Sequence, residues 1–270
     1  MNIVLGLALA VGIMTFTLTI FRDIGSSMIF NSDAFMIVIG GTTIAMFIGF
    51  PVQRLRLALR DIMATFSDQG SREETISNIL DVARMYRKTD VRSIENRMST
   101  VDDHFLKMGV NLLINNHSDA EIKNTMEREV MLKVINSNFS QNVIKTIARL
   151  TPSFGLAGTV ISLIKMFNHL DSIDSIAPMM AVALMSTFYG VIIANLFMMP
   201  LNAKLKERAI LSEASMNLTI EGILMIKQME HPLRIEEKLG GYHVIDESAI
   251  RDLHSKPQST ESVVYRFQKV

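Results

Sequence analysis

The apolar positions along the chain gather into long uncharged stretches, and this pattern predicts membrane-spanning helices. The stretches cover residues 1–21, 34–53, 150–164 and 176–203. A helix needs about 20 apolar residues to cross a bilayer core, so the third stretch is short when taken alone. A short polar linker joins it to the longest uncharged stretch, and the two together predict a hairpin. We therefore expect four spans, arranged as two hairpins.

The first stretch has a second interpretation, because an apolar N-terminal segment is also typical of a secretory signal peptide. Signal peptides carry Lys or Arg before their apolar segment, and neither residue precedes this one. A membrane span is therefore the preferred interpretation of residues 1–21.

Basic residues near the ends of the predicted spans are distributed unequally between the two sides of the membrane. Lys and Arg are retained on the cytoplasmic side of membrane proteins. Eight of these residues lie on one side and two on the other: Arg54, Arg56, Arg60, Lys145, Arg149, Lys204, Lys206 and Arg208 against Arg22 and Lys165. We therefore predict that both termini and the long central segment are cytoplasmic.

The segment between the second and third spans has the pattern of soluble amphipathic helices. Ser71 and Ser118 each precede a Glu by three residues, which is the capping-box signature of a helix start. Apolar residues then recur at helical spacing, as at Ile122, Met126 and Val130. Strand patterns are weak throughout. The expected fold class is an all-α membrane protein with four transmembrane helices and a helical cytoplasmic domain inserted between spans 2 and 3.

This pattern divides the chain into four parts. Residues 1–53 form a first transmembrane hairpin, and residues 54–142 form the cytoplasmic helical domain. Residues 143–203 form the second transmembrane hairpin. Residues 204–270 form a cytoplasmic helix, expected to end near Gln228, and a polar tail.

Composition excludes several classes of chemistry. The chain of 270 residues has 27 basic and 27 acidic side chains, so no global charge favours nucleic acid. It has no cysteine, which excludes disulfides, thiolate metal sites and thiol catalysis. Its six histidines are dispersed and lie outside the spans. We expect no enzyme activity, no resident metal and no cofactor.

The predicted spans also lack ionisable residues in their interiors. Ionisable side chains inside a membrane usually mark proton relays and ion paths. The chain alone therefore has no group that could pass a proton through the bilayer. If it takes part in ion transport, a partner helix must supply the carboxylate.

The third and fourth spans nevertheless have a face of small and hydroxyl-bearing residues. The residues recur at intervals of four and three: Gly155, Thr159 and Ser162 in the third span, and Ala183, Thr187 and Gly190 in the fourth. Close helix packing is one interpretation, because small residues let membrane helices approach. The lining of an ion path is the other.

Two prolines lie near the cytoplasmic ends of these spans. Proline removes a backbone donor and leaves a carbonyl without its helical partner one turn earlier. Pro152 and Pro200 could simply kink the helix ends, or they could act as hinges at the mouth of a pore.

Four segments resemble the flagellar stator subunits of the MotA/PomA type. Residues 151–161 (TPSFGLAGTVI) are similar to their third span, and residues 178–190 (PMMAVALMSTFYG) to their fourth. Residues 200–205 (PLNAKL) are similar to the end of that span, and residues 231–239 (HPLRIEEKL) to the C-terminal segment. The resemblance covers the chain to about residue 240.

The resemblance implies a function, a location and partners. Such subunits lie in the bacterial inner membrane and form a pentamer around two copies of a single-span MotB/PomB-type partner. That partner supplies the ion-carrying Asp that this chain lacks. Ion flow turns the ring, and charged residues of the cytoplasmic domain push the rotor protein FliG. Arg87, Lys88 and Glu95 match those charges. Without the resemblance, these three would be an ordinary exposed helix face.

The resemblance also bears on the transported ion. Thr159 and Thr187 match positions that carry hydroxyls in sodium-driven relatives, and Ser162 and Ser186 add two more. Hard cations such as sodium favour oxygen ligands. We expect transient Na⁺ near Thr159 and Thr187, with the proton as the alternative.

Related envelope machines provide an alternative to a flagellar role. An energiser of the TolQ/ExbB type shares the polar pair of spans but usually has three spans, and other MotA-like machines share the layout. The first hairpin favours the flagellar class.

Overall fold

The computed structural model describes residues 31–66, 72–88, 91–101, 103–170 and 173–240. Within these ranges all regular elements are helical. The predicted first span, the capping box at Ser71 and the polar tail lie outside the described residues. Three described helices are long and apolar enough to cross a membrane: Ser32–Gly49, Asp119–Phe167 and the run Ile176–Lys227. The all-helical membrane fold is thus confirmed.

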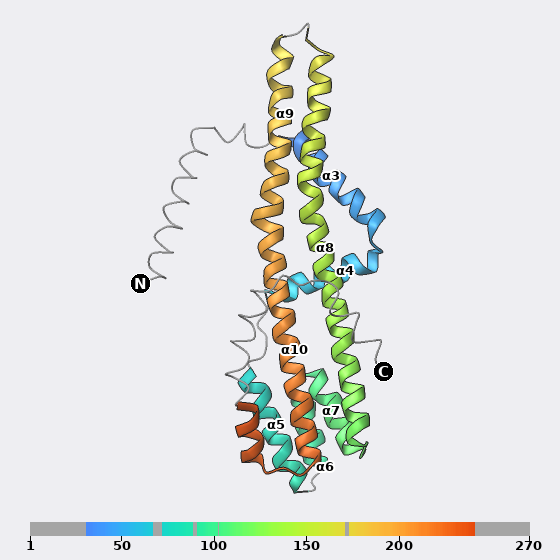
Figure 1. The fold of residues 1–270 in the computed structure, drawn as a ribbon, viewed down its shortest axis with the longest axis vertical. Helices are drawn as coiled ribbons and strands as arrows, with labels where there is room; N and C mark the ends of the chain where they lie inside the picture. Colours follow the sequence, from blue (N-terminus) through green and yellow to red (C-terminus); the bar gives the residue numbers. More distant parts are fainter. Residues whose placement is uncertain (1–30, 67–71, 89–90, 102, 171–172, 241–270) are drawn as a thin grey trace, which may run out of the picture. The chain divides into compact units, whose positions relative to one another are not determined.

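The helices follow one another with short connections (Figure 1). In chain order they are α3 (Ser32–Gly49), α4 (Val52–Ala64), α5 (Arg72–Arg87), α6 (Val91–Thr100), α7 (His104–Ile114), α8 (Asp119–Phe167), α9 (Ile173–Ile192), the π-helix η1 (Ile193–Met198) and α10 (Met199–Lys227). Residues 232–240 form a further helix.

The contacts between residues define two compact units. One contains residues 1–67 and 135–209, and the other contains residues 68–134 and 210–270. Helices α8 and α10 each contribute residues to both units. The predicted boundaries at 142/143 and 203/204 fall inside these two helices, so the division into four parts stays a prediction.

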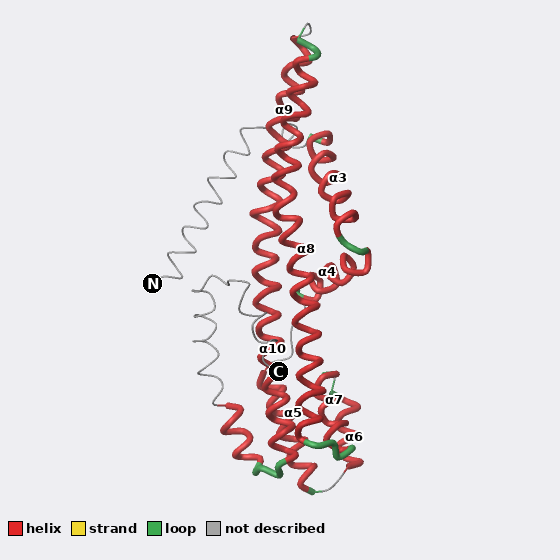
Figure 2. The backbone as a smooth tube through the Cα atoms, turned by 45° about the vertical axis from the view of Figure 1, so that its right-hand side comes forward, coloured by secondary structure: helices red, strands yellow, loops and turns green. Residues whose placement is uncertain are grey.

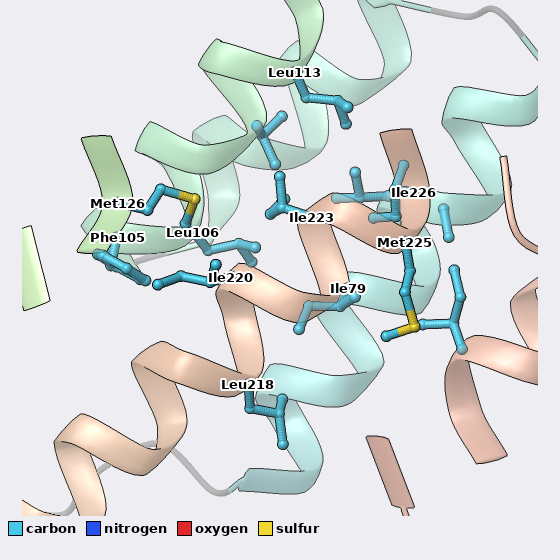
Figure 3. Packing of buried hydrophobic residues seen from close by; sticks show 14 of the residues in the cluster. Ile79, Phe105, Leu106, Leu113, Met126, Leu218, Ile220, Ile223, Met225 and Ile226 are labelled. Atoms are coloured by element: carbon cyan, nitrogen blue, oxygen red, sulfur yellow. The ribbon is translucent and has the colours of Figure 1, made fainter. Parts of the chain in front are cut away.

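The unit of residues 68–134 and 210–270 has an apolar core. Side chains of α5, α6 and α7 meet the beginning of α8 and the end of α10 (Figure 3). Ile79, Leu106 and Ile223 are fully buried there. The apolar stripes predicted from helical spacing lie in this core or against it, including Ile122, Met126 and Val130. Burial of such stripes is the main favourable term in folding a helical domain.

Helix ends in this unit follow from local backbone chemistry. The Ser118 N–H donates to Glu121 Oε2 at 2.9 Å, and the Glu121 N–H donates back to Ser118 Oγ at 3.3 Å, which confirms the predicted capping box. These Ser118 hydrogen bonds hold the pKa of Glu121 below its usual value. Helices α7 and α10 end at Ile114 and Lys227, and two residues after each end, Asn116 and Met229 have positive φ. Their N–H groups and those of the following residues close Schellman-type turns.

The other unit contains the apolar helices. Figures 1 and 2 show α3 beside the paired helices α8 and α9. The Asn31 N–H donates to the Tyr189 hydroxyl at 2.8 Å, and the Phe35 and Tyr189 rings meet edge to face at 6.1 Å. A Cβ at Gly41 would lie 2.3 Å from the Phe154 ring, so the small residue lets α3 approach α8. Helix α3 ends at Gly49 because Pro51 disfavours helical backbone at Phe50.

Candidate functional site

Helices α8 and α9 approach each other closely at two glycines, one on each helix. A Cβ at Gly155 would lie 2.7 Å from the Ser186 carbonyl oxygen and 3.2 Å from the Thr187 Cα. A Cβ at Gly190 would lie 2.6 Å from the Thr151 carbonyl oxygen and 3.0 Å from the Pro152 Cα. The obstructing atoms belong to the backbone and cannot rotate away. Both positions therefore require glycine if the two helices keep this separation.

Serine hydroxyls complete the contact between the two helices. Ser162 on α8 is buried and donates a hydrogen bond to the Met179 carbonyl oxygen on α9 at 2.6 Å. Ser186 is fully buried and donates to the Val182 carbonyl oxygen of its own helix at 2.8 Å. A Cβ at Gly158 would lie 2.6 Å from the Ser186 hydroxyl. Gly158 thus belongs to this contact, although the sequence analysis did not select it.

The two threonines lie at the edge of the contact. Thr159 and Thr187 are half-buried, whereas Gly155, Ala183 and Gly190 are buried. The Thr159 hydroxyl donates to the Leu156 carbonyl oxygen of its own helix at 2.6 Å. The structure therefore brings Gly155, Ser186 and Gly190 together at the centre and leaves both threonines beside them. Hydroxyls at the edge are the ones that a further helix could reach.

Each predicted hinge proline lies near a feature that can distort a helix. Around Pro152 the Thr151 and Ser153 hydroxyls donate to the carbonyl oxygens of Ile147 and Arg149, at 2.8 and 3.1 Å. Hydrogen bonds of this kind often bend helices. Pro200 lies two residues after η1, where the Met199 N–H donates to the Ala194 carbonyl oxygen five residues earlier. π-Turns are sites of helix distortion and frequently occur at functional sites.

The outward face of this helix pair is strongly apolar. Its exposed large side chains include Leu156, Val160, Leu163 and Ile164 on α8, and Met180, Leu184 and Val191 on α9. Among the described residues, no group of His, Asp or Glu is arranged to hold a metal ion. The pair offers hydroxyl and carbonyl oxygens but no titratable group in its apolar interior. It can line a path for an ion, and a carboxylate would have to come from elsewhere.

The predicted rotor-contact residues lie together on α5 and α6. Arg87 is the last residue of α5, Lys88 follows it, and Glu95 lies on α6; all three are exposed. Arg97 joins the two helices by donating to Asn78 Oδ1 at 3.3 Å and to Asp81 Oδ2 at 3.2 Å. This bridge holds α6 against α5. Sequence spacing alone did not reveal the bridge.

Comparison with known proteins gives a consistent result. Residues 97–217 match the model of the MotA/TolQ/ExbB proton channel family. Motility protein A of Treponema pallidum is 29% identical over 215 residues, which cover 79% of this chain and 83% of that protein. Chemotaxis protein PomA of Vibrio alginolyticus is 24% identical, over 80% of this chain and 85% of that protein.

Solved structures have the same fold. The flagellar MotAB stator complex from Bacillus subtilis contains a chain that is 26% identical and has a TM-score of 0.71; the match covers 79% of this chain and 84% of that one. The C. jejuni MotAB structure contains a chain with a TM-score of 0.76 at 20% identity, over 90% of this chain and 96% of that one, and shows the fold alone.

Proposed function

We propose that this chain is a member of the MotA/TolQ/ExbB proton channel family and the A-type stator subunit of a bacterial flagellar motor. The observation that carries the proposal is the likeness to motility proteins, which extends over about four fifths of the chain. The close contact of α8 with α9, with hydroxyls along its edge, supports an ion path at this helix pair.

The proposal includes an arrangement in the membrane. Four spans cross the inner membrane, with both termini and the domain between spans 2 and 3 in the cytoplasm. The excess of Lys and Arg at one set of span ends supports this orientation. A pentamer of this chain surrounds a MotB/PomB-type partner dimer. The absence of carboxylates from the interiors of the predicted spans supports the need for that partner.

The partner and the rotor meet different parts of the chain in this proposal. Thr159 and Thr187 lie beside the α8–α9 contact, where the partner's span could bring a carboxylate next to their hydroxyls. Arg87, Lys88 and Glu95 present exposed charge to the rotor protein FliG.

A second candidate function is a TolQ/ExbB-like energiser of another envelope machine. The matching family includes such channels. The likeness to named motility proteins over most of the chain favours the flagellar assignment.

Replacing the cation of the medium tests both the assignment as a motor subunit and the identity of the transported ion. Cells that carry this protein and its partner as their sole stator should stop swimming when sodium is replaced by potassium at fixed pH. The reason is that hydroxyl and carboxylate oxygens coordinate the small hard cation. Swimming speed, followed by video microscopy, is the measurement.

The control for this exchange is a protonophore. Swimming that persists in potassium and ceases with the protonophore would make the proton the transported ion and leave the motor assignment standing. Cells that never swim, although the protein reaches the membrane with its partner, would contradict the motor assignment.

Replacement of Pro152 or Pro200 by alanine should impair torque more than assembly. Alanine restores a backbone donor and is favoured over proline within a helix by roughly 3 kcal/mol. The helix should therefore become more regular and more stable while the hinge is lost. Swimming speed normalised to the amount of protein in the membrane is the measurement.

Pro232 provides a matched control for the hinge variants. It is the first residue of the helix 232–240, a position where proline costs nothing. Cells that carry the Pro232→Ala variant should swim normally. Normal swimming of both Pro152→Ala and Pro200→Ala would remove the hinge role.

A further inference from the structure

Helix α4 has two faces of opposite character. Its inner face is held against α8 and α10: Asp61 Oδ2 accepts a hydrogen bond from the Ser140 hydroxyl at 2.6 Å, and the Arg54 guanidinium lies 4.2 Å from the Phe139 ring centroid. The Arg208 guanidinium donates to the Ala64 carbonyl oxygen. Ala58 is buried on this face. These contacts fix the rotation of α4 about its own axis.

The opposite face exposes large apolar side chains. Val52, Leu59 and Met63 on α4, and Phe66 just after it, are each more than half exposed; Met63 is 68% and Phe66 is 70% exposed. The spacing of Val52, Leu59 and Met63, seven and four residues, places them along one stripe. Phe66 follows the end of the helix, and the Lys204 ammonium on α10 lies 4.6 Å from its ring centroid. Arg56 and Arg60, one turn apart and both exposed, lie along one edge of that stripe. A helix with an apolar stripe and adjacent arginines is typical of an interfacial membrane helix.

The position of α4 indicates that the stripe meets lipid. The helix begins at Val52, three residues after the apolar helix α3 ends at Gly49, so its start lies at a membrane surface. Figures 1 and 2 both show α4 running crosswise to α8. A helix crosswise to membrane-spanning helices lies along the bilayer surface rather than through it.

Charge identifies the kind of lipid. Basic residues gather at this end of the apolar helices: Arg54, Arg56, Arg60, Lys145, Arg149, Lys204, Lys206 and Arg208. Among the described residues of this unit, the acidic side chains are Asp33, Asp61, Asp174 and Glu207. Asp61 is already hydrogen-bonded to Ser140, and Asp33 and Asp174 lie in the first turns of α3 and α9. The same unit of a second copy would thus offer Glu207 to the two arginines, whereas phosphate headgroups offer a full layer of anions.

We propose that α4 is an anionic-lipid-binding helix. Val52, Leu59, Met63 and Phe66 enter the boundary between headgroups and acyl chains, and Arg56 and Arg60 bind the phosphates of anionic phospholipids. This binding depends on the surface of α4 and is separate from the ion path and the rotor contact.

Lipid titration of the purified full chain tests whether Arg56 and Arg60 bind anionic headgroups. Phosphatidylglycerol should raise the midpoint of thermal unfolding in detergent at a lower concentration than phosphatidylcholine does, because a ligand of the folded state stabilises it. Each arginine near an anionic surface contributes roughly fivefold in affinity. The double variant Arg56→Gln/Arg60→Gln should therefore need at least roughly tenfold more phosphatidylglycerol for the same rise in the unfolding midpoint.

The matched control removes two other exposed charges. Arg128 and Lys133 lie on α8 in the other unit and are exposed. The variant Arg128→Gln/Lys133→Gln should keep the wild-type response. Equal responses of the wild type to the two lipids, or a wild-type response of the α4 variant, would overturn the proposal.

A spin label distinguishes lipid from a second copy of the chain. Because the chain has no cysteine, the variants Met63→Cys and Gln53→Cys each accept one nitroxide. In nanodiscs that contain phosphatidylglycerol, the label at 63 should be relaxed by oxygen more than by a water-soluble nickel chelate, and the label at 53 should show the reverse. A label at 63 protected from both reagents would mean that another copy covers the stripe, and the lipid proposal would fail.

Discussion

Replacing Gly155 or Gly190 by alanine should destabilise the protein and abolish swimming. Each added methyl group would lie within 2.7 Å of a carbonyl oxygen on the facing helix. Backbone atoms cannot move aside as a flexible side chain can, so α8 and α9 must separate. Overpacking of this kind costs about 1–3 kcal/mol. The midpoint of thermal unfolding in detergent and the amount of protein in the membrane are the measurements.

Gly40 on α3 provides a control with the opposite expected sign. A Cβ there meets no atom within 4 Å. Alanine is favoured over glycine within a helix by about 1 kcal/mol, so Gly40→Ala should be neutral or stabilising. Gly155→Ala and Gly190→Ala proteins as stable as Gly40→Ala would mean that the two helices do not need this close approach.

At this contact, residue spacing in the sequence leaves one choice open on each helix. Residues three and four positions away from a buried glycine lie on either side of the same helix face, because a turn takes 3.6 residues. Spacing therefore could not decide between Gly158 and Thr159 on α8, or between Ser186 and Thr187 on α9. The structure buries Gly158 and Ser186 and leaves the threonines half-buried. The other predicted members of the two stripes, Gly155 and Ser162 on α8 and Ala183 and Gly190 on α9, are buried, so only the two threonines lie off the packed face.

Other features were predictable because a single strong force determines them. The uncharged stretches marked α3, the apolar end of α8 and α9, since charge is excluded from a bilayer core. The capping box at Ser118 and the end of α10 near Gln228 followed from local chemistry. The π-turn η1 was not predictable, because one extra residue in a turn leaves no mark on an entirely apolar segment.

The role of α4 needed tertiary contacts. Its sequence is amphipathic, and amphipathicity alone predicts a helix packed on a soluble core. The structure instead places Asp61 and Arg54 on the inner face, where they bond to Ser140 and Asn136 of α8. Two charged residues on the packed face turn the apolar stripe outward. The hydrophobic pattern shows that a helix has an apolar and a polar face. Only the tertiary contacts show which of the two faces packs against the rest of the protein.

Reversing the charge of Arg87 or Glu95 should strongly reduce swimming speed while leaving the protein assembled in the membrane. Both side chains are exposed and on the surface of α5 and α6, so their replacement removes no buried contact. A like-charge contact across an interface costs several kcal/mol, and about 1.4 kcal/mol is tenfold in an equilibrium constant. Arg87→Glu and Glu95→Lys should therefore lower occupancy of the rotor contact, and with it swimming speed, by at least roughly tenfold.

Arg128 and Glu129 on α8 provide matched controls for these reversals. Both are exposed charges of the same unit. Cells that carry Arg128→Glu or Glu129→Lys should swim normally. Membrane fractions must contain each variant at the wild-type level for the comparison to count. Loss of assembly in Arg87→Glu and Glu95→Lys would indicate a structural role for the pair. Normal assembly together with wild-type swimming would contradict a rotor contact at Arg87 and Glu95. The contact would then have to involve exposed charges elsewhere on the unit.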